Sequence, residues 1–109
     1  MRYHRFFEWH DEKAETNKRK HRVTFEDAAA VLADDQADRY HLERYDDKHS
    51  MGEDRYVTIA SHPAGRSIVL FISWTQRRKK GGRVVTRIIS ARRATPKERA
   101  SYAKAIRNK

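Results

Sequence analysis

The sequence contains no cysteine and no long apolar run. Without cysteine, neither a disulfide framework nor a thiolate metal site is available, which fits an intracellular protein. No apolar stretch approaches the roughly 18 residues that a membrane span requires. The opening segment MRYHRFFEWHDEK lacks the apolar centre of a signal peptide. We therefore expect a cytoplasmic protein that does not enter a membrane.

Glycine and proline are also scarce, with four and two residues among 109. No segment has the composition of a flexible linker, and no internal repeat is present. The expected elements follow one another through short connections. A chain of this length suits one modest core, so we predict a single domain over residues 1–109.

Acidic residues are nearly missing from the second half of the chain. Residues 1–62 hold 11 Lys and Arg against 14 Asp and Glu, whereas residues 63–109 hold 14 against one. The formal net charge of +10 therefore resides in the second half. Such concentrated charge is typical of a surface that binds nucleic acid or another anion. The alternative is a surface that only confers solubility, although such surfaces usually intersperse both signs.

Apolar periodicity and turn residues predict an α+β fold. Helices are expected over residues 10–22, 24–35 and 95–109. Strands are expected over residues 3–8, 39–45, 55–61, 67–75 and 83–92, with the cationic segment 76–82 as a loop. The best-marked element is the last helix, where Thr95, Pro96 and Glu98 form a capping box with proline at its preferred position. The two early helices must cover one face of a small antiparallel sheet.

Three arginines lie within or at the end of the last expected strand, namely Arg87, Arg92 and Arg93. A guanidinium group on a core strand is costly unless an anion meets it. Strand alternation places Arg87 and Arg92 on opposite faces, so they can share a site only if a bulge or strand end intervenes.

Short motifs with characteristic order and spacing run along the whole chain. The residues that carry them are Phe7, Trp9, Lys13, Asn17, Lys20, His21, Val23, Thr24, Phe25, Glu26, Asp27, Gly52, Glu53, Arg55, Ile88 to Arg92, Ala94, Thr95, Glu98 and Tyr102. Together they resemble the BrnT toxin family, although each piece alone is unspecific. Two positions depart from the family pattern: His10 replaces an aspartate, and Trp74 stands where many members have tyrosine.

The resemblance implies a RelE-like fold and an endoribonuclease activity that inhibits translation. It also implies a type II toxin–antitoxin pair with BrnA, a ribbon-helix-helix antitoxin, so that operator DNA is met only through the antitoxin. RelE-like toxins are taken to cleave RNA through attack of the ribose 2′-OH, without a metal or cofactor. The sequence agrees, because its carboxylates and six histidines lack metal-ligand spacing.

Such cleavage needs a proton acceptor, a stabiliser of the phosphorane charge and a proton donor. Arg92 is the first candidate for charge stabilisation, because a helix N-terminus follows it directly; the alternative is an ion pair with Glu53 or Asp54. His21 or Lys20 are candidates for proton transfer, or else His21 caps helix carbonyls and Lys20 is solvated.

Arg87 either contacts RNA or forms a salt bridge to the acidic segment. Glu53 either accepts a proton or orients an arginine, or it forms a loop ion pair with Arg55. Trp74 either stacks on an unpaired base or completes the core with Ile68, Leu70 and Ile72, whose parity it shares.

Phosphate attraction that depends on salt is expected from the remaining cations of the second half. The predicted RNA-binding residues are Arg55, Trp74, Arg77, Arg78, Lys79, Lys80 and Arg93. An acidic segment of the antitoxin is expected to cover the same face. The alternative function is a basic RNA- or ribosome-binding module without turnover.

Overall fold

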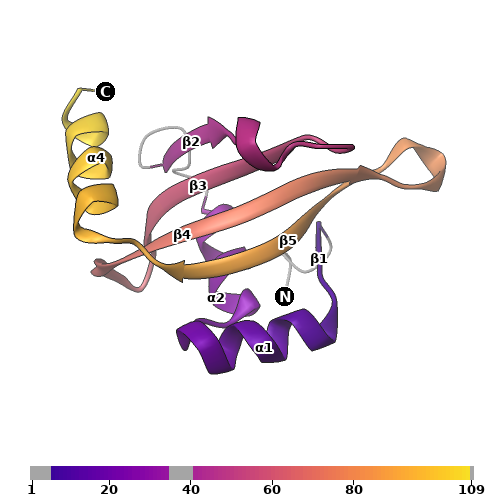
Figure 1. Cartoon of the computed structure of the whole chain (residues 1–109), viewed down its shortest axis with the longest axis horizontal. Helices are drawn as coiled ribbons and strands as arrows, with labels where there is room; N and C mark the ends of the chain where they lie inside the picture. The colour runs from indigo at the N-terminus through magenta and orange to yellow at the C-terminus, as the bar shows by residue number, and fades with distance from the viewer. Residues whose placement is uncertain (1–5, 35–40, 109) are drawn as a thin grey trace.

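The computed structural model describes residues 6–34 and 41–108, apart from the side chain of Arg66. These residues form five strands, three α-helices and two single-turn 3-10 helices (Figure 1). In chain order the elements are β1 (Phe7–Glu8), α1 (Asp11–His21), α2 (Phe25–Leu32), β2 (His41–Tyr45), η2 (Asp47–His49), β3 (Arg55–His62), β4 (Gly65–Arg78), η3 (Lys80–Gly82), β5 (Val84–Arg93) and α4 (Pro96–Arg107). The predicted α+β class is confirmed.

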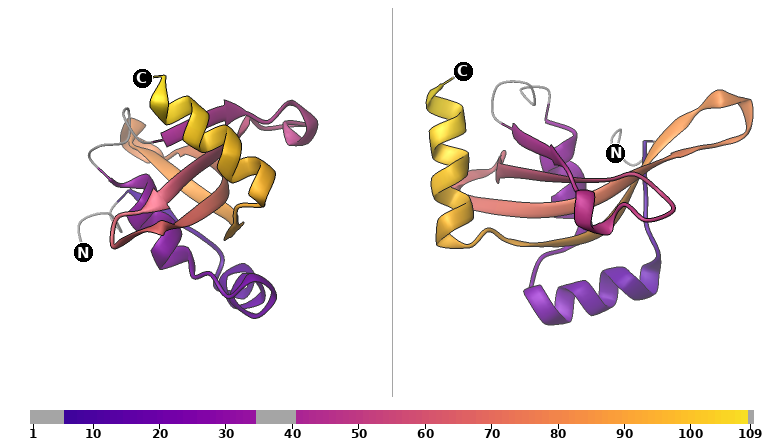
Figure 2. Two further views of the ribbon diagram at one scale, coloured as in Figure 1. Left: turned by 90° about the vertical axis from the view of Figure 1, so that its left-hand side faces the viewer. Right: turned by 45° about the horizontal axis from the view of Figure 1, so that its top comes forward.

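The strands form one sheet in the order β1-β5-β4-β3-β2. All neighbours are antiparallel except β1, which runs parallel to β5. The cationic segment 76–82 was wrongly expected to be a loop throughout, because the β4–β5 ladder continues to the pair Arg78 and Val84. Gly81 and Gly82 have φ values of 82° and 81°, a left-handed conformation that glycine adopts without strain, and they close the hairpin. Figure 2 shows this hairpin projecting beyond the rest of the molecule.

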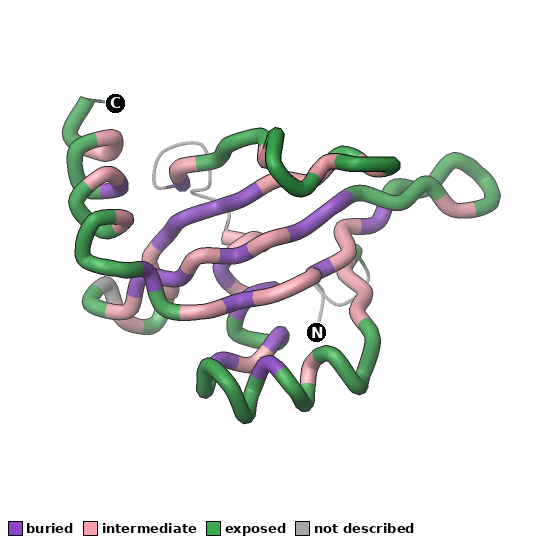
Figure 3. Tube along the Cα trace, in the orientation of Figure 1, coloured by how far each residue is buried: buried purple, intermediate pink, exposed green. Residues whose placement is uncertain are grey.

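One face of the sheet, here called the covered face, carries much of the core. Its β4 residues are Leu70, Ile72 and Trp74, which belong to one buried cluster with α2 residues such as Phe25 and Ala28. Figure 3 shows buried positions along the middle of β3 and β4. Helix α2 begins as predicted, since the Thr24 side chain accepts a hydrogen bond from the Asp27 backbone N–H at 3.0 Å. Helix α2 therefore covers one face of the sheet, as the sequence analysis required of the early helices.

Helix α1 covers the part of the β5 edge that the short strand β1 does not pair. The buried Asn17 side chain donates to the Ala91 carbonyl at 2.7 Å and accepts from the Ala91 N–H at 3.0 Å. It also donates to the Val23 carbonyl at 3.0 Å. One amide side chain therefore replaces a neighbouring strand at this point of β5, because buried backbone groups must find partners.

Helix α4 packs against one end of the opposite face, here called the open face. Its predicted capping box is present, with Thr95 and Glu98 each accepting a hydrogen bond from the other's backbone N–H. The buried Tyr102 hydroxyl lies 2.7 Å from the Ser61 hydroxyl near the end of β3. None of the described helices is long and apolar enough to cross a membrane.

A β-bulge in β5 changes which side chains share the open face. Ser73 pairs with Ser90 and Trp74 pairs with Ile88, so Ile89 is an extra residue without a partner on β4. Cross-strand partners point to the same side of a sheet, which places Arg92 with Phe71 and Arg87 with Thr75. Because Phe71 and Thr75 have the same parity on β4, the bulge brings Arg87 and Arg92 onto one face. The bulge that Arg87 and Arg92 need in order to share a face is therefore present in β5.

Candidate functional site

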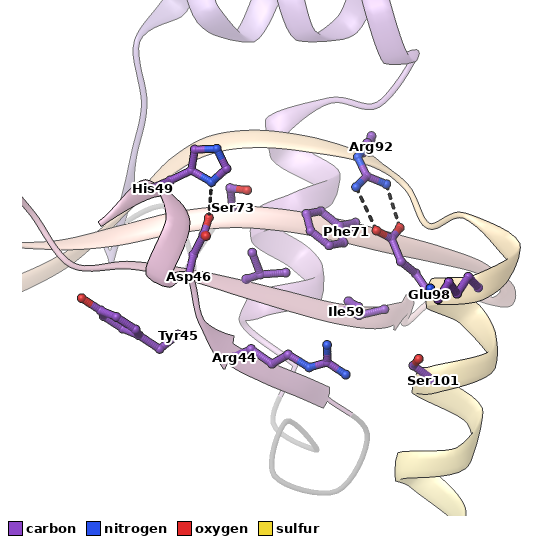
Figure 4. A pocket seen from close by; sticks show the side chains of 12 residues that line it. Arg44, Tyr45, Asp46, His49, Ile59, Phe71, Ser73, Arg92, Glu98 and Ser101 are labelled. Atoms are coloured by element: carbon purple, nitrogen blue, oxygen red, sulfur yellow. Dashed lines mark hydrogen bonds and ion pairs between the residues drawn. The ribbon is translucent and has the colours of Figure 1, made fainter. Parts of the chain in front are cut away.

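The open face holds a cavity of about 470 Å³ between α4 and the turn η2. Its floor consists of Val57 and Ile59 of β3 with Phe71 and Ser73 of β4. Figure 4 shows His49 and Arg92 on the same side of β4, with Ser73 and Phe71 between them. The polar and charged residues of its lining are Arg44, Tyr45, Asp46, His49, Ser73, Arg92, Lys97, Glu98 and Ser101.

Three cations line this cavity from three different elements. Arg44 comes from β2, Arg92 from β5 and Lys97 from the first turn of α4. The Arg92 guanidinium lies 4.0 Å above the centre of the Phe71 ring, a cation–π contact. Arg44 and Lys97 form no ion pair with any residue in the described part of the chain. The cavity therefore combines an apolar floor with cationic walls.

Arg92 is held by Glu98 and not by Glu53 or Asp54, the partners that the sequence suggested. Its Nη1 and Nη2 atoms donate to Glu98 Oε1 and Oε2 at 2.7 and 3.0 Å. The hydrogen bond from Arg92 is the main cause that lowers the pKa of Glu98 below its ordinary value, and the same pairing raises the pKa of Arg92. Both groups stay charged at neutral pH, so Arg44 and Lys97 are the lining cations without an ion-pair partner among the described residues.

A histidine and an aspartate complete the wall opposite α4. His49 Nδ1 lies 2.9 Å from Asp46 Oδ2, within the single turn of η2. The turn is fixed to β3: the Ser50 hydroxyl donates to the Asp46 carbonyl at 2.5 Å and accepts from the Arg55 N–H at 2.9 Å. The Asp46 N–H also donates to the Arg55 carbonyl at 2.8 Å. Hydrogen bonds to β3 therefore hold the Asp46–His49 pair in place, although the pair lies in the connection between β2 and β3.

Sequence analysis missed Arg44, Asp46, His49 and Lys97 as site residues. Each lies in a segment that the sequence marks only as a strand end, a polar loop or a helix start. The one local signal was the spacing of Asp46 and His49, because residues three apart in a helical turn can contact each other.

The predicted pair Lys20 and His21 lies elsewhere. Both residues are exposed at the end of α1, beside a separate hollow that Ile89 and Ser90 also line. Helix α1 ends at Arg22, whose left-handed backbone lets its N–H bond the Lys18 carbonyl at 2.8 Å. Among the described residues, the His21 side chain makes no hydrogen bond to a helix carbonyl. A role for these two residues in proton transfer stays a prediction, but they do not line the Arg92 cavity.

Arg87 forms a salt bridge with Glu8, which is the second of the two roles expected for it. Its Nε atom donates to Glu8 Oε2 at 2.6 Å, and Lys79 Nζ lies 2.7 Å from Glu8 Oε1. Burial alone raises the pKa of Glu8, but the hydrogen bonds from Lys79 and Arg87 outweigh it and lower the pKa overall. His10 begins α1 without a side-chain cap, and its Nε2 lies 3.2 Å from Arg87 Nη1.

Glu53 likewise binds two predicted RNA-binding residues. Its carboxylate oxygens lie 3.3 Å from Arg55 Nη2 and 3.1 Å from Arg77 Nη2. The guanidinium of Arg78 donates to the Gly82 carbonyl at 3.4 Å, whereas Lys80 has no ion-pair partner among residues 6–34 and 41–108. These side chains lie toward the projecting hairpin and do not line the cavity with Arg92.

The last two predicted residues lie on the covered side of the sheet. Trp74 is buried, its ring stacks on Tyr56 at 4.8 Å, and its Nε1–H donates to Thr58 at 2.8 Å. It is a core residue, as its parity indicated, and not a surface platform for a base. Arg93 is exposed beside a hollow that Asp27 and His62 line.

Among the residues that the structure describes, no three His, Asp or Glu side chains gather closely enough to hold a metal ion. The prediction of metal-independent chemistry remains to be tested by experiment.

Comparison with protein families supplies an identity for this arrangement. The model of a family described as "Ribonuclease toxin, BrnT, of type II toxin-antitoxin system" matches residues 9–98. A search of curated proteins gave no match. The family match covers most of the chain, including α1, the whole sheet after β1 and the first residues of α4. The chain therefore belongs to the BrnT family of ribonuclease toxins of type II toxin–antitoxin systems.

Proposed function

We propose that the chain is a metal-independent endoribonuclease whose cleavage centre is the cavity between α4 and η2. The observation that carries the proposal is the convergence of Arg44, Arg92 and Lys97 with His49 over one apolar floor. Phosphate is the ligand that such a set of cations favours, because guanidinium groups bind it with parallel hydrogen bonds. Phe71 supplies an aromatic side chain on which an unpaired base can stack.

The contacts of the three cations indicate a separate role for each. Arg44 and Lys97 form no ion pair with other described residues, so they can bind a phosphate without breaking an existing contact. Arg92 stabilises the phosphorane by turning one of its two hydrogen bonds from Glu98 to a phosphate oxygen. Attack of the ribose 2′-oxygen then yields a 2′,3′-cyclic phosphate and a free 5′-hydroxyl. The sheet holds these groups in position, so binding the substrate needs little reorganisation.

Cleavage in the presence of excess EDTA tests the proposal. The expected products carry 2′,3′-cyclic phosphate ends, and loss of activity in EDTA would contradict a metal-independent mechanism. Arg92→Ala should slow cleavage by about 10²- to 10³-fold, whereas Arg93→Ala is the matched control, since Arg93 is its neighbour in β5 but lies outside the cavity. Thermal unfolding of both variants separates an effect on the site from an effect on folding, because Arg92→Ala also leaves Glu98 without its partner.

We further propose that cleavage inhibits translation in the cytoplasm and that a BrnA-like ribbon-helix-helix antitoxin neutralises the protein. An acidic segment of the antitoxin fits the open face, because Arg44 and Lys97 offer charges that no described residue neutralises. Co-expression should then relieve growth arrest, and Arg44→Glu should weaken the complex. Growth arrest that persists beside a stably bound antitoxin would contradict occlusion of the site.

A further inference from the structure

We propose that His49 is the general base of the cavity and that Asp46 positions it; this inference rests on the proposed function above. The sequence left the proton acceptor unassigned, and its first candidates, Lys20 and His21, line a different hollow. His49 and Arg92 line the same cavity, one from the turn η2 and the other from the end of β5 (Figure 4). A substrate phosphate between them would meet a proton acceptor and a charge stabiliser together.

The contact with Asp46 selects the tautomer that a base requires. The carboxylate at 2.9 Å from Nδ1 is an acceptor, so His49 donates its Nδ1–H and leaves the lone pair of Nε2 free. A carboxylate also fixes the ring orientation and stabilises the imidazolium that forms when the base takes a proton. The Asp46 side chain is only 18% exposed, whereas that of His49 is 64% exposed. The anchor is therefore shielded, and the ring remains open to a large substrate.

The other described histidines do not offer this combination. His62 also contacts an aspartate, with Nε2 at 3.3 Å from Asp27 Oδ1, but the pair lines a hollow with Arg93 on the covered side. His10 lies beside Arg87, and His41 is buried. Only His49, among the histidines in residues 6–34 and 41–108, lines the cavity with Arg92.

In the proposed step, Nε2 of His49 accepts the proton of the 2′-hydroxyl as its oxygen forms a bond to phosphorus. The bond between phosphorus and the 5′-oxygen breaks, and the 5′-oxygen keeps the electron pair and takes a proton from water at the cavity mouth. The hydroxide that remains is neutralised when the imidazolium releases its proton. RNA is thus converted to a 2′,3′-cyclic phosphate and a 5′-hydroxyl, and the enzyme returns to its starting state.

A base of this kind makes the cleavage rate rise with pH. A general base accepts a proton only in its unprotonated form, so the rate should rise with pH until the base is fully deprotonated. The charged groups around it come from its own turn, from β2, from β5 and from α4, and they are Asp46, Asp47, Lys48, Arg44, Arg92, Lys97 and Glu98. Of these, only Asp46 contacts the ring of His49 through an ion pair or hydrogen bond.

The test compares His49→Ala, Asp46→Asn and the control His62→Ala, which removes a histidine–aspartate contact outside the cavity. Steady-state cleavage is measured on an oligoribonucleotide that contains one site mapped with the unmodified protein. His49→Ala should slow cleavage at least about 100-fold and remove the rise with pH. Asp46→Asn should lower kcat by about tenfold or more without changing KM, and it should keep the rise with pH. His62→Ala should cleave like the unmodified protein.

A second substrate distinguishes a base from an acid. With sulfur in place of the 5′-oxygen at the scissile bond, the leaving group needs no proton, so only the loss of an acid is rescued. The defect of His49→Ala should persist on this substrate, and its disappearance would overturn the assignment as a base. If His49→Ala cleaves normally while Arg92→Ala is inactive, the inference fails and the proposed function stands. If the unmodified protein produces no cyclic phosphate ends, the proposed function fails first.

Discussion

The two ends of the open face carry similar numbers of cations but differ in how those cations are paired. Toward the hairpin, Glu8 binds Arg87 and Lys79, and Glu53 binds Arg55 and Arg77. Toward α4, the only described ion pair of a cavity arginine is Arg92 with Glu98, and Arg44 and Lys97 remain unpaired. Each of these hairpin-end cations therefore already contacts a carboxylate, whereas Arg44 and Lys97 at the α4 end are available to a ligand.

This difference shows that the number of cations in a segment does not locate a binding site. Of the five predicted catalytic residues, only Arg92 lines the cavity at the α4 end, where it meets a histidine from a turn and a lysine from a helix. The hairpin cations remain available for long-range attraction, because partial pairing does not remove their influence on an approaching polyanion. The following variants separate these two roles.

The largest difference is expected between Arg92 and Arg87, which share a face but not an environment. Arg92→Ala should lower kcat/KM for RNA cleavage by about 10²- to 10³-fold, because it removes the group that stabilises the phosphorane. Arg87→Ala should change kcat/KM by less than about tenfold, since Glu8 already neutralises Arg87. Equal losses in both variants, with both proteins folded by circular dichroism, would contradict the division of the face.

Replacing Arg44 should have a smaller effect on kcat/KM, and this effect is simpler to interpret because the change breaks no described ion pair. Arg44→Ala should lower kcat/KM by about tenfold, the value of one charge-assisted hydrogen bond to phosphate. The control is Arg99→Ala, which removes an exposed arginine of α4 that does not line the cavity. Steady-state kinetics on one RNA measures both, and a similar loss in the control would indicate a non-specific charge effect.

The hairpin should affect affinity without affecting chemistry. Replacing Arg78 and Lys80 by alanine should weaken RNA binding a few-fold and reduce the slope of log affinity against log salt by about one to two. Cleavage at saturating RNA should be unchanged, because these residues lie outside the cavity. Fluorescence anisotropy across a salt series measures the slope, and a large fall in the saturated rate would place the hairpin in the cleavage centre.

The smallest effect concerns stability and its dependence on pH. Arg92 lowers the pKa of Glu98, so this carboxylate stabilises the fold above its unfolded pKa near 4.5, and the contribution is lost as pH falls through the folded value. Glu98→Gln should therefore cost about 1 kcal/mol at pH 7, since the pair is partly exposed, and nothing in acid. Glutamine can still close the capping box, so the variant isolates the charge. Urea unfolding from pH 7 to 3 measures the difference.

Local patterns predicted most of the fold. The helices of Thr24 and Thr95 begin where their capping residues indicated, and the continuous apolar run of β4 is the centre of the sheet. The length of the β4–β5 hairpin was underestimated because the polar residues 76–78 were expected to form a loop. A two-stranded ribbon that projects from the molecule can expose such side chains on both of its faces. Cationic strands of this kind carry no apolar alternation from which to recognise them.

The site was less predictable because it depends on pairings between distant segments. Glu8 and Arg87 are 79 residues apart, and nothing in either segment indicates that they meet. The bulge at Ile89 has no glycine to mark it, yet it decides which face carries Arg87. Arg92 was found because the start of a helix follows it directly. His49 was not, because a polar loop gives no indication of the face toward which it folds.

The most direct test of the cavity as the RNA site is an NMR titration of the ¹⁵N-labelled His49→Ala variant. The ligand is an oligonucleotide of the mapped cleavage sequence with a 2′-deoxy sugar at the scissile position, which binds but cannot be cleaved. The largest shifts of backbone amides should cluster at Arg44, Ser73, Arg92 and Ser101. Shifts centred on Lys20 and His21, or confined to the hairpin, would contradict the location of the cleavage centre.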